Sequence, residues 1–147
     1  VYLYSTQLKE YLERQQYFGE LIDNVVKGSN IKISIENTGI YNYTYIVQAI
    51  TKLLEYDNFV LTWDIGHDFS SSDIDRDYII KNIDKLCHLH IHDAIGKRNH
   101  LPLFNGEIDI HKVLELARKR KCTSVIETKT VAGLKQSVGE LKKRGYV

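Results

Sequence analysis

Four side chains that can bind a divalent metal ion recur along the chain, each at or next to the end of an apolar, strand-like run. Glu36 follows IKISI, Asp64 follows FVLTW, His90 lies within LCHLHIHD, and Glu127 follows SVI. Three carboxylates and one imidazole make an oxygen-rich ligand set, which suits Mn²⁺, Mg²⁺ or Co²⁺ and also accommodates Zn²⁺. The residue types therefore predict one divalent metal site.

The spacing of these four residues indicates that each belongs to its own βα unit. Successive members lie 28, 26 and 37 residues apart, and a strand, a helix and their loops typically need about thirty residues. Strands that alternate with helices form a parallel sheet, and a (β/α) barrel carries its reactive residues at the C-terminal ends of its strands. One carboxylate in such a place often only caps a helix or forms a salt bridge, so the prediction depends on the recurrence.

The elements that must position these residues follow from the hydrophobic periodicity. Strands are expected at residues 31–36, 59–64, 86–92 and 125–126. Helices are expected at residues 7–26, 46–56, 78–83, 110–119 and 134–141. This is an α/β pattern of one leading helix and four βα units in a single domain, residues 1–147. A full (β/α)8 TIM barrel has eight units and about 250 residues, so we predict the C-terminal half of such a barrel, with the N-terminal half absent.

An open half-barrel would expose two strand edges, which proteins normally cover. We therefore expect a missing half-barrel, a partner chain or a second copy in a homo-oligomer to complete the fold. The chain opens with Val1 and contains no methionine. Both features lead us to expect a piece of a longer product.

Composition narrows the classes of partner and the compartment. The formal net charge of +1 indicates no basic stripe for nucleic-acid phosphates, so a small molecule is favoured as the partner, with nucleic acid not excluded. Two cysteines in 147 residues do not make a disulfide scaffold and indicate a reducing compartment. No apolar run reaches about 18 residues and no signal peptide is evident. We expect a cytoplasmic protein that does not enter a membrane.

Five motifs occur in a fixed order between residues 31 and 143. They are Ile35-Glu36-Asn37-Thr38-Gly39, Trp63-Asp64-Ile65-Gly66-His67, His90-Ile91-His92-Asp93, His100-Leu101-Pro102-Leu103 with Gly106-Glu107-Ile108-Asp109, and Ile126-Glu127-Thr128. Together they resemble the C-terminal half of the xylose isomerase-like TIM barrels, a superfamily of sugar isomerases and epimerases that also includes the endonuclease IV type of nuclease (AP endonuclease family 2). The resemblance implies that Glu36, Asp64, His90 and Glu127 hold one divalent metal. It also implies that His67 lies near the substrate or a further metal.

The chain departs from the pattern that it resembles at two places, the first of them specific to the nuclease branch. Arg98 stands where that branch has an aspartate, two residues before the histidine that His100 matches. The segment Phe104-Asn105-Gly106 replaces the Gly-x-Gly turn that commonly follows His-Leu-Pro-Leu. His100 stays an additional candidate for the site.

Alternative interpretations stay open for the histidines. His88, His90 and His92 share one face of a strand, so any of them can be a core residue. The His-x-x-Asp pattern favours His90 as the ligand, with Asp93 as an additional candidate that supports it. His67 either orients substrate or hydrogen-bonds a neighbouring loop.

Three functions are compatible with this sequence. The first is a divalent-metal-dependent sugar or sugar-phosphate isomerase or epimerase, in which Glu36 and Glu127 remove and return a proton α to a carbonyl through an enediolate, with His67 beside them. The second is an endonuclease IV-like phosphodiesterase acting on abasic DNA, against which Arg98 and the near-neutral charge count. The third is a non-catalytic barrel that binds a sugar.

Overall fold

The computed structural model describes residues 7–147 as alternating helices and strands. The helices are α2 (Leu8–Val26), α3 (Thr44–Leu53), α4 (Ile65–Ser70), α5 (Arg76–Lys81), α6 (Ile110–Arg120) and α7 (Val131–Lys143), with a 3₁₀ turn η1 (Ile83–Lys85). The strands are β1 (Ile33–Glu36), β2 (Phe59–Asp64), β3 (Leu86–Ile91), β4 (Asp93–Ile95), β5 (Arg98–Leu101) and β6 (Thr123–Ile126).

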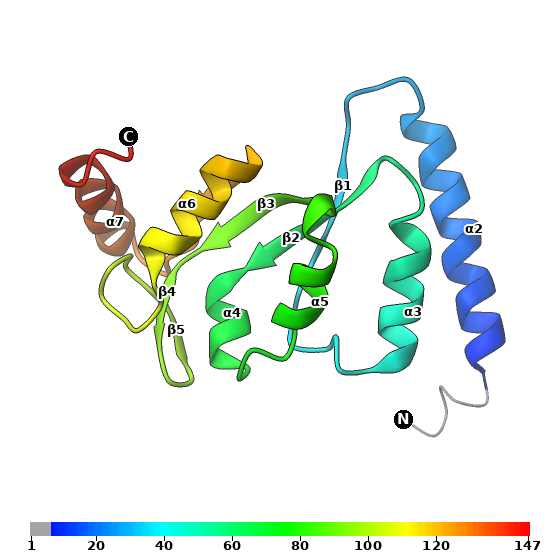
Figure 1. The fold of residues 1–147 in the computed structure, drawn as a ribbon, viewed down its shortest axis with the longest axis horizontal. Helices are drawn as coiled ribbons and strands as arrows, with labels where there is room; N and C mark the ends of the chain where they lie inside the picture. The colour runs from blue at the N-terminus through cyan, green and yellow to red at the C-terminus, as the bar shows by residue number, and fades with distance from the viewer. Residues whose placement is uncertain (1–6) are drawn as a thin grey trace.

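Four of the strands form one parallel sheet in the order β1-β2-β3-β6 (Figure 1). Helices connect successive strands, as in a (β/α) barrel, and β1 and β6 are the edge strands. Helix α2 precedes β1 and packs on α3. The predicted α/β fold class is confirmed: the described residues form a partial TIM-barrel-like fold, and their sheet is open.

The core lies where apolar strand residues meet the helices. Leu61 of β2 and Leu89 of β3 are fully buried there, together with Ile79 of α5. Trp63 belongs to the same cluster, is 7% exposed, and donates its indole N–H to Asp68 Oδ2 of α4 at 3.1 Å. The tryptophan therefore points away from its neighbour Asp64, as expected from the alternation of side chains along a strand.

Polar side chains join neighbouring strands of the sheet. The hydroxyl oxygens of Ser34 and Thr62 lie 2.5 Å apart, and His88 Nδ1 lies 2.6 Å from Thr123 Oγ1. These pairs connect β1 to β2 and β3 to β6. They contrast with the branched aliphatic residues that typically fill a TIM barrel.

Two features of the chain were not predicted. Helix α4 begins directly after Asp64, and β4 and β5 form an antiparallel hairpin after β3. The hairpin is important because it carries His100 back toward the sheet. Both elements are short: α4 has six residues, and β4 and β5 have three and four.

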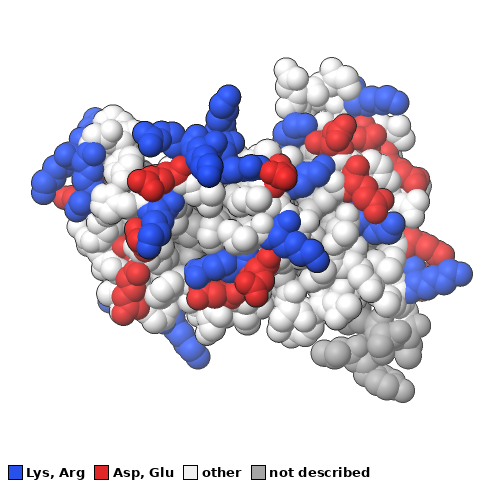
Figure 2. Space-filling view, viewed as in Figure 1, with Lys and Arg blue, Asp and Glu red and all other residues white. Residues whose placement is uncertain are grey.

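Charged side chains of both signs are interspersed over much of the face shown in Figure 2. Lysines and arginines gather over the end of α6, whose last turn contains Arg118, Lys119 and Arg120. Cations at the end of a helix complement its dipole, so this cluster needs no ligand to explain it.

Within residues 7–147, no helix combines the length and the apolar character needed to cross a membrane.

Candidate metal centre

The four predicted ligands meet at the C-terminal ends of their strands, around one ring nitrogen of His90. His90 Nδ1 lies 3.0 Å from Glu36 Oε1, 3.4 Å from Glu127 Oε1 and 3.9 Å from Asp64 Oδ2. Two donor atoms that bind one cation at about 2.1 Å lie about 3.0 to 4.2 Å from each other, depending on the angle between them. These separations are compatible with one coordination sphere for Glu36, Asp64 and His90, whose ligand atoms all lie within 4.8 Å of one another, whereas Glu127 groups in the same way with Asp64 and His92.

Asp64 is the most enclosed member of the set. Its side chain is fully buried, and its Oδ1 caps α4 by accepting the His67 backbone N–H at 2.7 Å. Burial by itself would raise the pKa of Asp64, but the His92 ring and the His67 amide hold the pKa of this carboxyl below its ordinary value. The carboxylate is therefore ionised at neutral pH.

The second oxygen of Asp64 is where a cation fits. Oδ2 is buried and, among the described residues, has no hydrogen-bond partner with good geometry, although His67 Nδ1 lies 3.1 Å away. A buried charged oxygen without a partner is costly, and a metal ion is one of the groups that satisfy it. The donor set and this oxygen together fit a divalent cation.

Asn37, which directly follows Glu36, holds the first two ligand-bearing strands together. It is fully buried, and its amide pairs with the Asp64 backbone: Nδ2 donates to the Asp64 carbonyl at 3.1 Å, and the Asp64 N–H donates to Oδ1 at 2.7 Å. The pairing of β1 with β2 is thereby extended past Glu36. Sequence reasoning did not assign this role, although Asn37 stands within one of the motifs.

The loop after Asn37 is anchored by a second buried carboxylate. Asp75 accepts the backbone N–H of Gly39 at 2.6 Å and that of Tyr41 at 2.8 Å. Two consecutive loops on the ligand side of the sheet are thus tied to each other.

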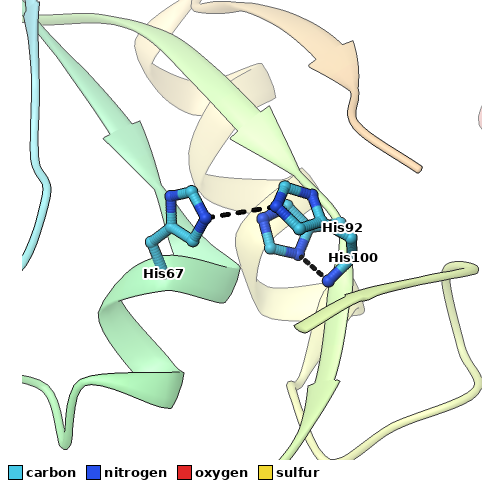
Figure 3. Close-up of side chains that lie close together, drawn as sticks. All are labelled: His67, His92 and His100. Carbon is cyan, nitrogen blue, oxygen red and sulfur yellow. Dashed lines mark hydrogen bonds between the residues drawn. The ribbon is translucent and has the colours of Figure 1, made fainter. Parts of the chain in front are cut away.

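Three histidines form a second cluster beside Asp64 (Figure 3). His67 comes from α4, His92 follows β3, and His100 comes from β5. The Nε2 atoms of His67 and His100 lie 3.2 Å apart, and the rings of His92 and His100 stack with their centroids at 4.1 Å. Three imidazole nitrogens can be placed within 4.8 Å of one another, which makes this a nitrogen-rich ligand set next to the oxygen-rich one.

In both His67 and His100, Nε2 faces the other histidine, and the opposite ring nitrogen, Nδ1, has a hydrogen-bond acceptor beside it. His67 Nδ1 lies 3.1 Å from Asp64 Oδ2, and His100 Nδ1 lies 3.2 Å from the Glu127 carbonyl oxygen. Burial, with smaller effects from the neighbouring histidines and Lys129, lowers the pKa of His100. His100 is therefore neutral at pH 7, and a neutral imidazole is the form that binds metals.

His92 was not predicted as a site residue, and the structure places it in the histidine cluster, next to Asp64. Its ring is fully buried, Nε2 lies 3.0 Å from Asp64 Oδ1, and Nδ1 accepts the His100 backbone N–H at 2.8 Å. Gly66 makes room for it, since a Cβ at position 66 would lie 2.0 Å from the ring. The signal available in the sequence was the His-x-His alternation.

Asp93 is placed differently from the expectation that it would support His90. Its carboxylate accepts the backbone N–H groups of Ala94, Gly106 and Ile108 at 2.8, 2.7 and 3.1 Å. These bonds hold the loop that follows β5. The same buried aspartate leaves no space for a side chain at Gly106, where a Cβ would lie 2.3 Å from Oδ1.

Phe104 stands where the resemblance led us to expect a glycine, and it adopts the left-handed backbone conformation that favours glycine, with φ of 67°. Its ring lies 4.2 Å from the Arg144 guanidinium, a cation–π contact. The turn is therefore formed without the first glycine.

Comparison with known proteins agrees with the fold. Residues 6–144 match the family model for the xylose isomerase-like TIM barrel. The chain is also 27% identical over 125 residues to an uncharacterized protein of Methanocaldococcus jannaschii, an alignment that covers 82% of this chain and 49% of that protein. The chain thus spans about half the length of the curated relative that it matches. On the extent of the family match, the chain belongs to the xylose isomerase-like TIM barrel family.

Proposed function

We propose that this chain carries the metal centre of a divalent-metal-dependent sugar or sugar-phosphate isomerase or epimerase. The observation that supports this most directly is the convergence of Glu36, Asp64 and Glu127 on His90 Nδ1. In this proposal residues 1–147 form one domain that corresponds to the C-terminal half of a barrel. The metal would be Mn²⁺, Mg²⁺ or Co²⁺, with Zn²⁺ as the alternative.

The reaction requires removal of a proton from the carbon next to a carbonyl, and its return at a chosen position or face. A bound divalent cation would supply Lewis-acid stabilisation of the negative charge that develops on the substrate oxygens. Glu36 and Glu127 lie on either side of His90, at the ends of different strands, so one, ionised, would take the proton from one face, and the other, protonated at the start, would deliver a proton to the opposite face. The partly exposed His67 ring would orient a substrate hydroxyl.

A second candidate function is a metal-dependent phosphodiesterase of the endonuclease IV type. The observation in its favour is the His67, His92 and His100 cluster, because a nitrogen-rich set beside an oxygen-rich one suits a cluster of zinc ions. Arg98, a cation where a further metal ligand is expected, counts against it.

Elemental analysis and solvent deuterium exchange together test these alternatives. About one Mn, Co or Mg per chain, with deuterium from D₂O entering a ketose next to its carbonyl, would support the isomerase. Two or three zinc ions with cleavage of an abasic oligonucleotide would favour the nuclease, since hydrolysis of a phosphodiester leaves C–H bonds untouched. Sugar binding without exchange would favour the non-catalytic barrel, and a protein that binds no divalent metal would contradict both enzymatic proposals.

A further inference from the structure

A cavity of about 270 Å³ opens beside the histidine cluster, between β5 and the start of α7. Its walls include Arg98, Asn99, His100, Thr128, Lys129 and Thr130. We propose that this cavity binds the phosphate group of a sugar phosphate. The inference rests on the proposed isomerase or epimerase function and narrows its substrate class from sugars in general to phosphorylated sugars.

The charge of the cavity is the first argument. Arg98 and Lys129 both line it, and no carboxylate does. Neither cation forms an ion pair or a side-chain hydrogen bond within residues 7–147, whereas Arg76, Arg120 and Arg144 each pair with a carboxylate. Two unpaired cations around one small cavity favour an anionic ligand.

The neutral groups of the cavity also suit a phosphate, because amide and hydroxyl side chains can donate hydrogen bonds to its oxygens. Thr130 contributes a hydroxyl, and Asn99 contributes an amide that donates one hydrogen bond to Ser70 Oγ at 3.2 Å and has a second N–H to donate. The Thr128 hydroxyl already donates to the Thr130 carbonyl at 3.3 Å. The N-terminus of α7 is a smaller contribution, since the Thr130 hydroxyl oxygen already accepts the Gly133 N–H at 3.0 Å. The assignment therefore depends on the side chains of the cavity.

The position of the cavity relative to the metal centre is the second argument. His100 belongs both to the cavity wall and to the histidine cluster. Thr128 and Lys129 directly follow Glu127, whose carboxylate lies 3.4 Å from His90 Nδ1. A sugar whose carbonyl end lies at the metal centre would therefore place its phosphate end in the cavity.

Binding of inorganic phosphate to metal-free protein, followed by ³¹P NMR, tests the site without requiring turnover. The double variant R98Q/K129Q should bind phosphate about tenfold more weakly or worse, since two charge-assisted contacts are lost. The control R14Q/K119Q removes the same charge from α2 and α6 and should bind like the original protein. Equal binding by R98Q/K129Q, or no binding of phosphate by the original protein, would overturn the inference.

Competition then identifies the source of the phosphate. A sugar phosphate should displace inorganic phosphate, and the same sugar without its phosphate should not. Displacement by an abasic oligonucleotide but not by a sugar phosphate would overturn the assignment in favour of the nuclease. Because the measurement uses metal-free protein, a functioning phosphate site in a protein without metal affinity would show that the isomerase proposal had failed while the anion site remained.

Discussion

The two central strands of the sheet and its two edge strands hold their metal-ligand candidates in different ways. Asp64 on β2 and His90 on β3 have side chains that are 0% and 20% exposed, whereas Glu36 on β1 and Glu127, directly after β6, are each 35% exposed. The same contrast holds for the strands, since every residue of β2 is buried while three of the four residues of β6 are exposed.

In the proposed function, this difference would give the central and edge residues different roles. Asp64 is fixed by the His67 amide on its carboxylate and by Asn37 on its backbone. The Glu36 and Glu127 carboxylates are more exposed; both lie near His90 Nδ1, and Glu127 also groups with Asp64 and His92. We infer that the central pair anchors the metal and that the edge pair retains the freedom needed to transfer protons.

Substitution of the anchor should have the largest effect. Asp64→Asn preserves the volume and the helix cap but removes the buried charge, so we expect metal affinity to fall by more than about 100-fold, beyond the 10- to 100-fold typical of outer contacts. Titration calorimetry with Mn²⁺ measures this. Asp109→Asn is the matched control, because Asp109 also caps a helix, α6, but is exposed. Similar metal affinity in the two variants would contradict the anchoring role.

Substitution of a carboxylate at an edge strand should abolish activity while leaving the stability of the fold almost unchanged. Glu127→Gln should abolish deuterium exchange and weaken metal binding, while the free energy of unfolding changes by less than about 0.5 kcal/mol, as for other partly exposed positions. Urea unfolding and exchange assays measure the two effects, with exposed Glu115→Gln on α6 as the control. Exchange that persists in Glu127→Gln would remove this residue from the proposed chemistry.

The hydrogen bonds that join edge strand β1 to central strand β2 beyond Glu36 can also be removed by mutation. Asn37→Ala should destabilise the protein by about 2–4 kcal/mol, because a buried N–H and a buried C=O of Asp64 lose their partners. Asn58→Ala, which removes one 3.3 Å contact with Asp23, should cost less than 1 kcal/mol, as for about one partly exposed hydrogen bond. Equal unfolding free energies for the two variants would show that Asn37 does not hold the strands together.

The smallest chemical change, one added methyl group, tests the packing beside the centre. Gly66→Ala should destabilise the protein by about 1–3 kcal/mol, because the new Cβ would overlap the His92 ring. Gly139→Ala lies within α7 and meets nothing within 4 Å, so it should instead stabilise by about 0.5–1 kcal/mol. Opposite signs in thermal unfolding would identify the close approach of Gly66 to His92, and equal signs would contradict it.

The sequence was most informative where a feature depends on neighbours along the chain. Asp64 ends an apolar strand, which is a local feature of the sequence, so its place at a strand end could be predicted. Asn37 and His92 were not assigned roles because these depend on contacts across the sheet, with Asp64 in both cases. Their residue types alone do not reveal which strand lies alongside.

Short elements were the other source of error. Helix α4 spans less than two turns, and β5 is the polar segment Arg98 to Leu101, so neither shows the periodicity from which elements are inferred. The consequence for the site was specific. Without the hairpin, the sequence could name His100 as a candidate but could not place it against His67.

The indole of Trp63 gives the centre an optical probe. It is the single tryptophan of the chain, it precedes Asp64, and its N–H is bonded to Asp68 in the helix that Asp64 caps. Its intrinsic fluorescence therefore reports on one place only, the junction of β2 and α4. Shifts in emission intensity or wavelength during a metal titration can be followed without any label and assigned to that junction without mutagenesis.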